Sequence, residues 1–243
     1  MKEPICISKV EKKFSKKKAL FPFSLTIEPG TCVALCGGNG AGKSTLLRIL
    51  AGIHQPDAGI ISGLKEYSYG FMPDSIQIPA GVSGRDWLTY LARLKGVSKE
   101  QVKDVLELTG LTEAAGRDAA SYSRGMLQRL LFAQMMLGDP NVLLMDEPGN
   151  GLDPFWVDEW KKWIMEYREQ GKTILFASHM LRDVVAVADR IILLHEGKMI
   201  SDEPVHLWLK DSLEPEERFL RMIKKKDTSA EPEKIIKEKV RQS

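Results

Sequence analysis

Residues 4–35 carry short apolar runs separated by turns. The segments ICISKV, FSLTI and TCVALC are rich in β-branched and apolar residues, and the turn sequence EPG at 28–30 precedes the third. Alternation of this kind over four to eight residues is typical of strands. We therefore expect the N-terminal part of the chain to be built from short strands.

The hydrophobic period changes near residue 84. From there apolar side chains recur at helical spacing, at Trp87, Leu88, Leu91 and Leu94 and again at Val102, Val105, Leu106 and Leu108. Spacings of three and four residues place such side chains on one face of a helix. This stretch predicts a block of helices without strands.

Strand and helix patterns alternate again after about residue 140. NVLLMD and TILFAS are short unbroken apolar runs, and DRIILLHEGKMI predicts a hairpin that turns at Glu196-Gly197. Between the two runs, FWVDEWKKWIMEYREQG predicts a helix with Asp153 as N-cap, Pro154 in its first turn and Gly171 at its end. Buried strands that alternate with helices indicate a parallel α/β sheet. On this helix Trp156, Trp160 and Trp163 share one side, which favours core packing over a partner surface.

Composition is that of an ordinary soluble globular protein. Hydrophobic residues make up 43% of the chain and charged residues 28%, and the formal net charge of +2 gives no reason to expect a nucleic-acid partner. We expect Cys6, Cys32 and Cys36 to be small core residues in a reducing compartment, in preference to a disulfide or metal site. The chain shows no signal-peptide pattern and no apolar run approaching 18 residues, so we expect no membrane span.

The glycine-rich sequence that follows TCVALC suggests a phosphate-binding site. Residues 37–44 fit the pattern G-x-x-x-x-G-K-[ST], with an apolar run before them and the helical sequence TLLRILAG after them. The loop residues are Gly37, Gly38, Asn39, Gly40, Ala41, Gly42, Lys43, Ser44 and Thr45. Backbone N–H groups of such a loop and the N-terminus of the next helix attract phosphates. We expect Lys43 to reach the β- and γ-phosphates and Ser44 to ligate Mg²⁺; the alternative is a plain glycine turn between strand and helix.

A pair of carboxylates ends the predicted strand VLLMDEP. Carboxyl ends of parallel strands are where open α/β sheets bind ligands. We expect Asp146 to hold Mg²⁺ and Glu147 to be the general base that orients the attacking water. The alternative is that the two carboxylates only cap the start of a helix or turn. The presence of the phosphate loop in the same sequence makes this alternative the weaker one.

Three further motifs narrow the class of protein. YSRGMLQRL lies at 122–130, GNGLD at 149–153 and ASH at 177–179. With the phosphate loop and MDEP, in this order, the chain resembles the ATP-binding subunit of an ABC transporter over about residues 5–222. The resemblance implies an α/β phosphate-loop NTPase core with a mainly parallel sheet, an N-terminal antiparallel β subdomain and a helical subdomain at about 80–138. It makes residues 1–222 one ATP-binding domain and leaves a charged tail at 223–243. We expect this tail to be mobile or weakly helical, with a specific docking element as the alternative.

The same resemblance implies roles for residues outside the phosphate loop. Ser123 and Gly125 match the signature motif, which binds the γ-phosphate held by a second ATP-binding subunit, and Asp153 matches the loop that crosses between the subunits. His179 matches the switch histidine that contacts the γ-phosphate, and Phe14 matches the aromatic residue that stacks on adenine. Simpler alternatives are a core position for Phe14 and a strand-end cap for His179. ATP and Mg²⁺ are the implied cofactors.

The sequence departs from the family pattern at Asp74. In YGFMPDSIQ the family usually has glutamine after the proline, and this chain has Asp74 there. A carboxylate about 5 Å from a phosphate charge would cost on the order of 3 kcal/mol at an effective dielectric constant of 20. We therefore place Asp74 on the Mg²⁺ or water side of the site, with a solvent-facing loop cap as the alternative.

Three functions compete on these motifs. The first is an ATPase subunit that powers a membrane transporter, an exporter by its YSRGM and GLDP variants, with a permease partner docking near residues 81–94 and a location on the cytoplasmic face of the cell membrane. The second is a soluble ATP-driven clamp of the same superfamily, which would usually bring tandem domains, a coiled coil or a zinc insertion. The third is a relative that binds ATP without hydrolysis, against which Lys43, Asp146, Glu147 and His179 argue together.

Overall fold

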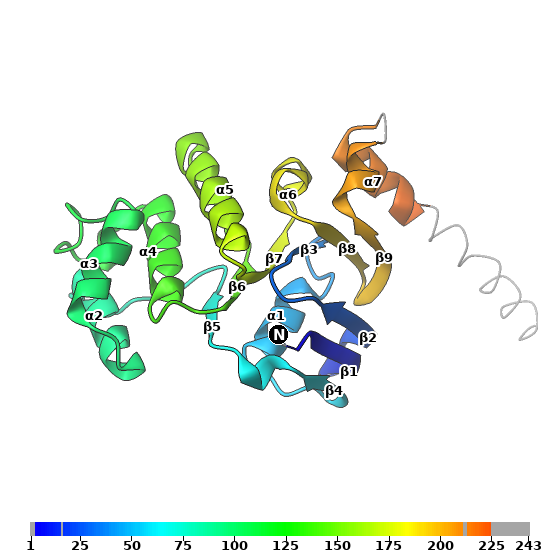
Figure 1. Ribbon diagram of the computed structural model, residues 1–243, viewed down its shortest axis with the longest axis horizontal. Coiled ribbons are helices and arrows are strands. Elements are labelled where there is room, and N and C mark those ends of the chain that lie inside the picture. Colours follow the sequence, from blue (N-terminus) through cyan, green and yellow to red (C-terminus); the bar gives the residue numbers. More distant parts are fainter. Residues whose placement is uncertain (1–2, 16, 211–212, 225–243) are drawn as a thin grey trace, which may run out of the picture.

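The computed structural model describes residues 3–15, 17–210 and 213–224 and consists of two sheets with helices around them (Figure 1). The charged tail expected at 223–243 lies outside the described residues from residue 225 onward. The strands are β1 Ile5–Phe14, β2 Lys17–Ile27, β3 Cys32–Cys36, β4 Ala58–Ser62, β5 Tyr69–Met72, β6 Val142–Asp146, β7 Thr173–Ser178, β8 Arg190–His195 and β9 Lys198–Pro204. The helices are α1 Lys43–Leu50, α2 Gly84–Lys95, α3 Lys99–Leu108, α4 Arg124–Met136, α5 Pro154–Glu169, α6 Leu181–Val187 and α7 Val205–Leu209, with 3₁₀ turns at Leu64–Glu66 and Ala119–Ser121 and a last helix at 215–224.

The larger sheet has six strands in the order β5-β6-β7-β3-β8-β9. Neighbours pair in parallel except for β8 and β9, which form the antiparallel hairpin expected at Glu196-Gly197. Both turn residues have positive φ, 47° at Glu196 and 76° at Gly197, as a two-residue hairpin turn requires. The parallel sheet predicted from the sequence is confirmed.

The smaller sheet is antiparallel and has the order β2-β1-β4. It confirms the N-terminal antiparallel β subdomain that the family resemblance implied. Helix α1 lies between the two sheets, and its apolar residues Leu46, Leu47 and Leu50 are buried there with Phe23 of β2.

Alternate residues of the central strands point into two different cores. In β3, Cys32, Ala34 and Cys36 belong to the core on the helical side, while Val33 and Leu35 belong to the core that contains α1. Because both faces of such a strand are buried, its sequence is an unbroken run of apolar residues. Burial raises the pKa of the Cys36 thiol to about 12, so this cysteine is an inert core residue.

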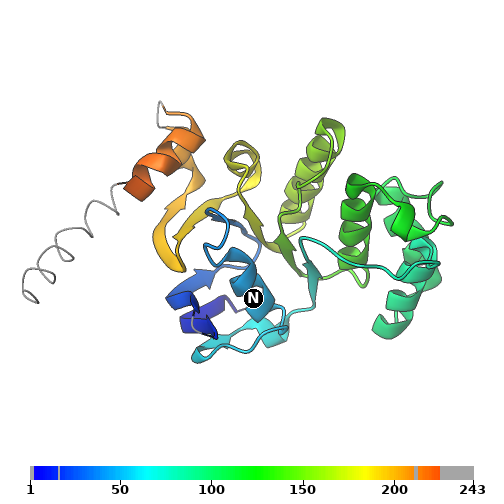
Figure 2. The ribbon, with the colours of Figure 1, turned by 180° about the vertical axis from the view of Figure 1, so that it is seen from behind.

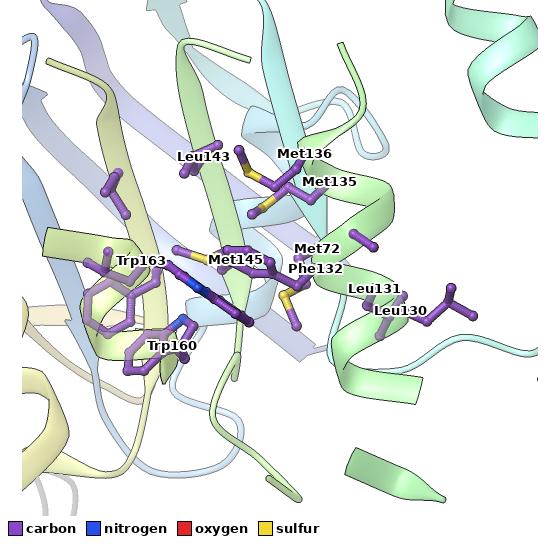
Figure 3. Close-up of a cluster of buried hydrophobic side chains, with 14 of the residues drawn as sticks. Met72, Leu130, Leu131, Phe132, Met135, Met136, Leu143, Met145, Trp160 and Trp163 are labelled. Atoms are coloured by element: carbon purple, nitrogen blue, oxygen red, sulfur yellow. The ribbon is translucent and has the colours of Figure 1, made fainter. Parts of the chain in front are cut away.

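The helical-side core joins α4 and α5 to the sheet (Figure 3). Phe132 of α4 stacks on Trp163 of α5 with ring centroids 4.7 Å apart, and Trp160 packs edge-on against Phe176 of β7. Trp160 and Trp163 are 3% and 6% exposed. The expectation that these tryptophans pack in the core is confirmed for both of them, and they fix the position of α4 relative to the strands.

Helices α2, α3 and α4 form a lobe at one end of the molecule (Figures 1 and 2). Arg129 of α4 ties this lobe to α5, because its Nη1 donates to the carbonyl oxygens of Thr109 at 2.7 Å and Gly110 at 3.0 Å while its guanidinium lies 4.1 Å from the ring centroid of Trp156. Gly110 has φ 60°, and a side chain there would collide with the Trp156 ring. The start of α4 is therefore held at a defined place beside the start of α5.

Candidate nucleotide-binding site

The phosphate-loop sequence forms the turn between β3 and α1. Gly42 is the N-cap of α1 with φ 105°, and a Cβ atom there would lie 2.8 Å from the carbonyl oxygen of Ala19. Gly37 packs so closely on the backbone of Leu194 that no larger residue would fit. Lys43 is 5% exposed, and its Nζ donates to the carbonyl oxygens of Gly37 at 2.7 Å and Gly38 at 3.3 Å. The lysine charge thus lies inside a loop whose N–H groups and helix N-terminus favour an anion.

Asp146 lies at the end of β6, opposite Ser44 of α1. The Ser44 hydroxyl donates to Asp146 Oδ1 at 2.9 Å, and Asp146 Oδ2 is buried without a hydrogen-bond partner. Burial raises the pKa of the Asp146 carboxyl above its usual value; the bond from Ser44 opposes this shift and nearby Asp74 adds to it. A buried carboxylate oxygen without a donor is the kind of ligand that Mg²⁺ prefers, since Mg²⁺ takes one or two protein oxygens with phosphate oxygens and waters. Within the described residues no group of three or more His, Cys, Asp or Glu side chains is placed to hold a metal.

Glu147 stands at the centre of a charged cluster. Its Oε1 lies 3.4 Å from Lys43 Nζ, and its Oε2 lies 2.7 Å from His179 Nδ1. Its backbone N–H donates to the carbonyl oxygen of Ala177 at the end of β7, at 2.9 Å. The backbone of Glu147 has φ 53°, an uncommon left-handed conformation for a residue with a side chain. The ends of β6 and β7 therefore place a carboxylate and an imidazole directly beside the phosphate loop.

An open cavity of about 720 Å³ joins these residues. Its walls are Lys17, Ala19, Gly38, Asn39, Gly40, Ala41, Gly42, Lys43, Ser44, Thr45, Asp74, Glu147, Asn150 and His179. The structure thus brings together the phosphate loop, Glu147, His179 and Asp74, as the sequence predicted. A volume of this size is ordinary for a small-molecule site.

Four residues outside the phosphate loop that were expected to contact the nucleotide do not line this cavity, and within the loop Gly37 does not line it either. Ser123 is the N-cap of α4 and accepts from the Met126 N–H, and Gly125 packs against the carbonyl of Gly151. Asp153 is the N-cap of α5 and accepts from the N–H of Trp156 at 3.1 Å. These positions would have to act on a nucleotide bound elsewhere.

Phe14 is the fourth of these residues. It lies at the end of β1 with 43% of its surface exposed, so the alternative of a core position is wrong. Its ring makes an edge contact with His54 at a centroid distance of 5.3 Å. Lys12 Nζ lies over the ring, 5.6 Å from its centroid, so a stacking partner could reach only the exposed part of Phe14.

Asp74 lies beside Arg48, a residue that no sequence motif had indicated. Arg48 of α1 lies with its Nη2 3.3 Å from Asp74 Oδ1. Lys17 and Asn150 also line the cavity and were not foreseen. Arg48 and Lys17 follow no phosphate-loop pattern, and only the fold brings them to the site.

The comparison with protein families decides the class. The family model described as "ABC transporter" matches residues 20–150, which is more than half of the chain. The chain belongs to the ABC transporter family. ATP-binding proteins of this family bind and hydrolyse ATP to power transport and work with membrane permease components, and this chain is such an ATP-binding subunit.

Curated relatives cover most of the chain. It is 36% identical over 217 residues to the uncharacterized ABC transporter ATP-binding protein YhcH of Bacillus subtilis, covering 84% of this chain and 71% of the relative. It is 31% identical over 211 residues to the ATP-binding protein NatA of the same species, with coverages of 80% and 85%. It is 32% identical over 224 residues to the Nod factor export ATP-binding protein I of Burkholderia lata, with coverages of 86% and 74%.

Solved structures share the fold. An ATP-binding subunit of an ABC transporter superposes with a TM-score of 0.80 at 21% identity, covering 91% of this chain and all of the other, and at that identity the likeness concerns the fold. An inward-facing structure described as a metal-chelate type ABC transporter superposes with a TM-score of 0.74 at 25% identity, covering 85% and 84%. In the described part of this chain, no helix combines the length and the apolar character needed to cross a membrane.

Proposed function

We propose that this chain is the ATP-hydrolysing subunit of an exporter and that it works as an ATP-dependent head-to-tail dimer on the cytoplasmic face of the membrane. The observation that carries the proposal is the meeting of Ser44, Lys43 and His179 with the two carboxylates at the end of β6. The direction of transport is supported by the relative named for Nod factor export.

Residues of the phosphate loop bind the nucleotide in this proposal. Lys43 and the N–H groups of Gly37–Thr45 hold the β- and γ-phosphates, because the loop presents positive charge and donors to a cavity that is open to solvent. Ser44 and Asp146 would hold Mg²⁺, since the free oxygen of Asp146 has no other ligand among the described residues. When bound, Mg²⁺ neutralises charge on the phosphates.

Glu147 is the general base in this proposal. Its carboxylate is fixed between Lys43 and His179, so it can accept a proton from a water that approaches the γ-phosphate. His179 is 54% exposed at its side chain and lines the cavity, which leaves its other ring nitrogen free to face a phosphate. Asp74 acts beside the metal or the water.

Ser123, Gly125 and Asp153 complete the site of a second subunit in this proposal. None of the three lines the cavity of its own chain, which supports this role, and they lie at the starts of α4 and α5. Phe14 stacks on adenine through its exposed ring. A homodimer or a dimer with a close paralogue would satisfy the same geometry.

The permease partner docks on the lobe formed by α2, α3 and α4. Tyr90 and Leu94 stand four residues apart on α2 and are 57% and 67% exposed. Large apolar residues exposed side by side often mark a partner surface. They fall inside the region 81–94 that the sequence suggested for the membrane partner.

Replacing Lys43 by alanine tests the phosphate-loop assignment. We expect ATP affinity to fall at least about tenfold, because a charged hydrogen-bond donor to the phosphates is lost. Lys162, which forms surface ion pairs on α5, supplies a matched control, and Lys162→Ala should bind ATP normally. Titration calorimetry measures both variants after thermal unfolding has shown that they are folded. Undiminished affinity in folded Lys43→Ala would contradict the assignment.

A further inference from the structure

A buried glutamine of α4 contacts the backbone of the proposed general base. Gln128 is 4% exposed, and its Nε2 donates to the carbonyl oxygens of Glu147 at 2.9 Å and of Pro148 at 3.2 Å. A primary amide has two N–H donors, so both are used on these two consecutive carbonyls. These two hydrogen bonds fix the orientation of the Gln128 side chain, and they also hold the backbone at Glu147 and Pro148.

Glu147 needs such support because of its backbone conformation. A residue with a side chain at φ 53° costs on the order of 1–3 kcal/mol and persists only where its surroundings hold it. Three hydrogen bonds hold it here. The Gln128 amide and the Asn150 N–H donate to the carbonyl oxygen of Glu147, at 2.9 Å and 3.1 Å, and the Glu147 N–H donates to the carbonyl of Ala177.

We propose that Gln128 is a positioning residue, which sets the place of the Glu147 carboxylate through the two peptide units that follow Glu147, those of the Glu147 and Pro148 carbonyls. The inference rests on the proposed role of Glu147 as general base. The direction in which the Glu147 side chain leaves the backbone follows from the orientation of these peptide units. Displacing a catalytic group by about 1 Å can cost about 10²-fold in rate. Loss of both Gln128 donors frees the units to rotate and carries the carboxylate away from Lys43 and His179.

The same contact joins the base to the start of α4. Gln128 lies one helical turn after Arg124, and the side chain of Arg124 packs on Gly151 while Gly125 packs on the Gly151 carbonyl. A shift of α4 along or across its axis would therefore move the Gln128 amide and, with it, the two carbonyls it binds. Gln128 therefore connects the start of α4 to Glu147, the proposed general base, of the same chain.

Replacing Gln128 by methionine removes the donors and keeps an unbranched side chain of similar length. In the full-length chain we expect kcat for ATP hydrolysis to fall about 10- to 100-fold, as is usual for residues that orient a catalytic group, with the Kd for ATP within about twofold of wild type. The matched control is Gln134→Met on the same helix. Gln134 accepts from Trp87 Nε1 at 2.9 Å, far along α4 from Glu147, so this variant should keep its turnover.

A glutamate at position 128 provides a second readout. Burial favours its neutral carboxyl, which donates one hydrogen bond, whereas the ionised form would face two carbonyl oxygens. The ratio of kcat for Gln128→Glu to kcat for wild type should therefore fall as the pH rises from about 6 to about 9. For Gln128→Met the corresponding ratio should stay flat. In Gln128→Glu the unfolding temperature and the Kd for ATP, measured at the same pH values, should stay near their values at low pH, whereas a purely structural role predicts that they change together with kcat.

Wild-type turnover and ATP affinity are measured first, because a wild-type chain that binds or hydrolyses no ATP would overturn the proposed function and this inference with it. With an active wild type, three results would overturn the positioning role alone. They are wild-type kcat in folded Gln128→Met, equal losses in Gln128→Met and Gln134→Met, and a loss of ATP affinity that parallels the loss of kcat. If Gln128→Met does not fold, the pH dependence of Gln128→Glu decides.

Discussion

At the residue scale, the pair formed by Asp74 and Arg48 shows how this site tolerates an extra carboxylate. The two side chains are 46% and 37% exposed, so their ion pair adds little stability. Its electrostatic effect is different: Asp74 contributes to the raised pKa of Asp146, and Arg48 opposes it. Arg48 thus offsets part of the repulsion that Asp74 brings to a site for phosphates. The arrangement favours a role for Asp74 on the metal or water side.

Substitutions of Asp74 should separate that role from a solvent-facing cap. Asp74→Gln should remain active, because it restores the residue usual in the family, and Asp74→Ala should lose roughly tenfold in kcat with a higher Mg²⁺ requirement. ATP affinity should change little, since Lys43 and the loop N–H groups remain. Steady-state ATPase assays over a Mg²⁺ titration measure these effects, with Asp57→Ala as a control because Asp57 is an exposed carboxylate paired with Lys12 outside the cavity. Wild-type kcat and Mg²⁺ dependence in Asp74→Ala would show that Asp74 is a cap.

Residues in short linear motifs were predictable, and residues that reach the site through the fold were not. Lys43, Asp146 and Glu147 follow fixed strand and loop patterns, and the structure gathers all three at one place. Arg48 becomes relevant only because α1 faces the segment after β5. Gln128 lies inside the motif YSRGMLQRL, but its contact with the Glu147 backbone arises only from the fold. No spacing along the sequence encodes such non-local contacts.

At the element scale, burial decided which strands could be foreseen. Every residue of β3, β6 and β7 is buried, so these strands appear in the sequence as unbroken apolar runs. The short strands β4 and β5 were missed. AGIIS in β4 is mostly exposed at the edge of its sheet, and YGFM in β5 has only four residues, so neither offers a clear period. The helix α5 was predicted with its caps because Asp153, Pro154 and Gly171 mark its ends locally.

Helix α2 carries a prediction at this scale. The double variant Tyr90→Ser/Leu94→Ser should leave thermal stability and basal ATPase activity near wild type, because both side chains are exposed. Association of the full-length chain with membranes from cells that produce its transporter should fall about tenfold, as expected when about 1.4 kcal/mol of contact is lost. Cosedimentation measures the association. Ile60→Ser on β4, at 70% exposure the matched control, should bind as wild type does, and equal binding by all variants would place the permease elsewhere.

At the scale of the whole molecule, the two halves of the proposed site lie on different parts of the chain. Helix α4, with Ser123 and Gly125 at its start, stands on one side of β5, and α1 with the phosphate loop stands on the other (Figures 1 and 2). The cavity around the loop is lined by neither Ser123 nor Gly125. Within one chain the cavity at the phosphate loop is open, and the start of α4 lies away from any nucleotide bound there. In a head-to-tail dimer, the start of α4 of each chain would cover the phosphate loop of the other and contact its nucleotide.

Glu147→Gln should therefore trap a dimer. The substitution keeps the shape of the side chain and removes its basicity, so hydrolysis should slow by about 10²–10⁴-fold while Lys43 and the loop still bind MgATP. Because the nucleotide stays intact, the contacts across the interface persist, and light scattering should show a mass near twice 27.3 kDa with MgATP and near 27.3 kDa without nucleotide. Glu147→Gln combined with Lys43→Ala is the control and should remain monomeric in both conditions, because it lacks the lysine that holds the phosphates. A Glu147→Gln chain that stays monomeric with MgATP over a wide concentration range would exclude the homodimer. A second ATP-binding chain, added in equal amount, would then have to restore association for the shared site to stand.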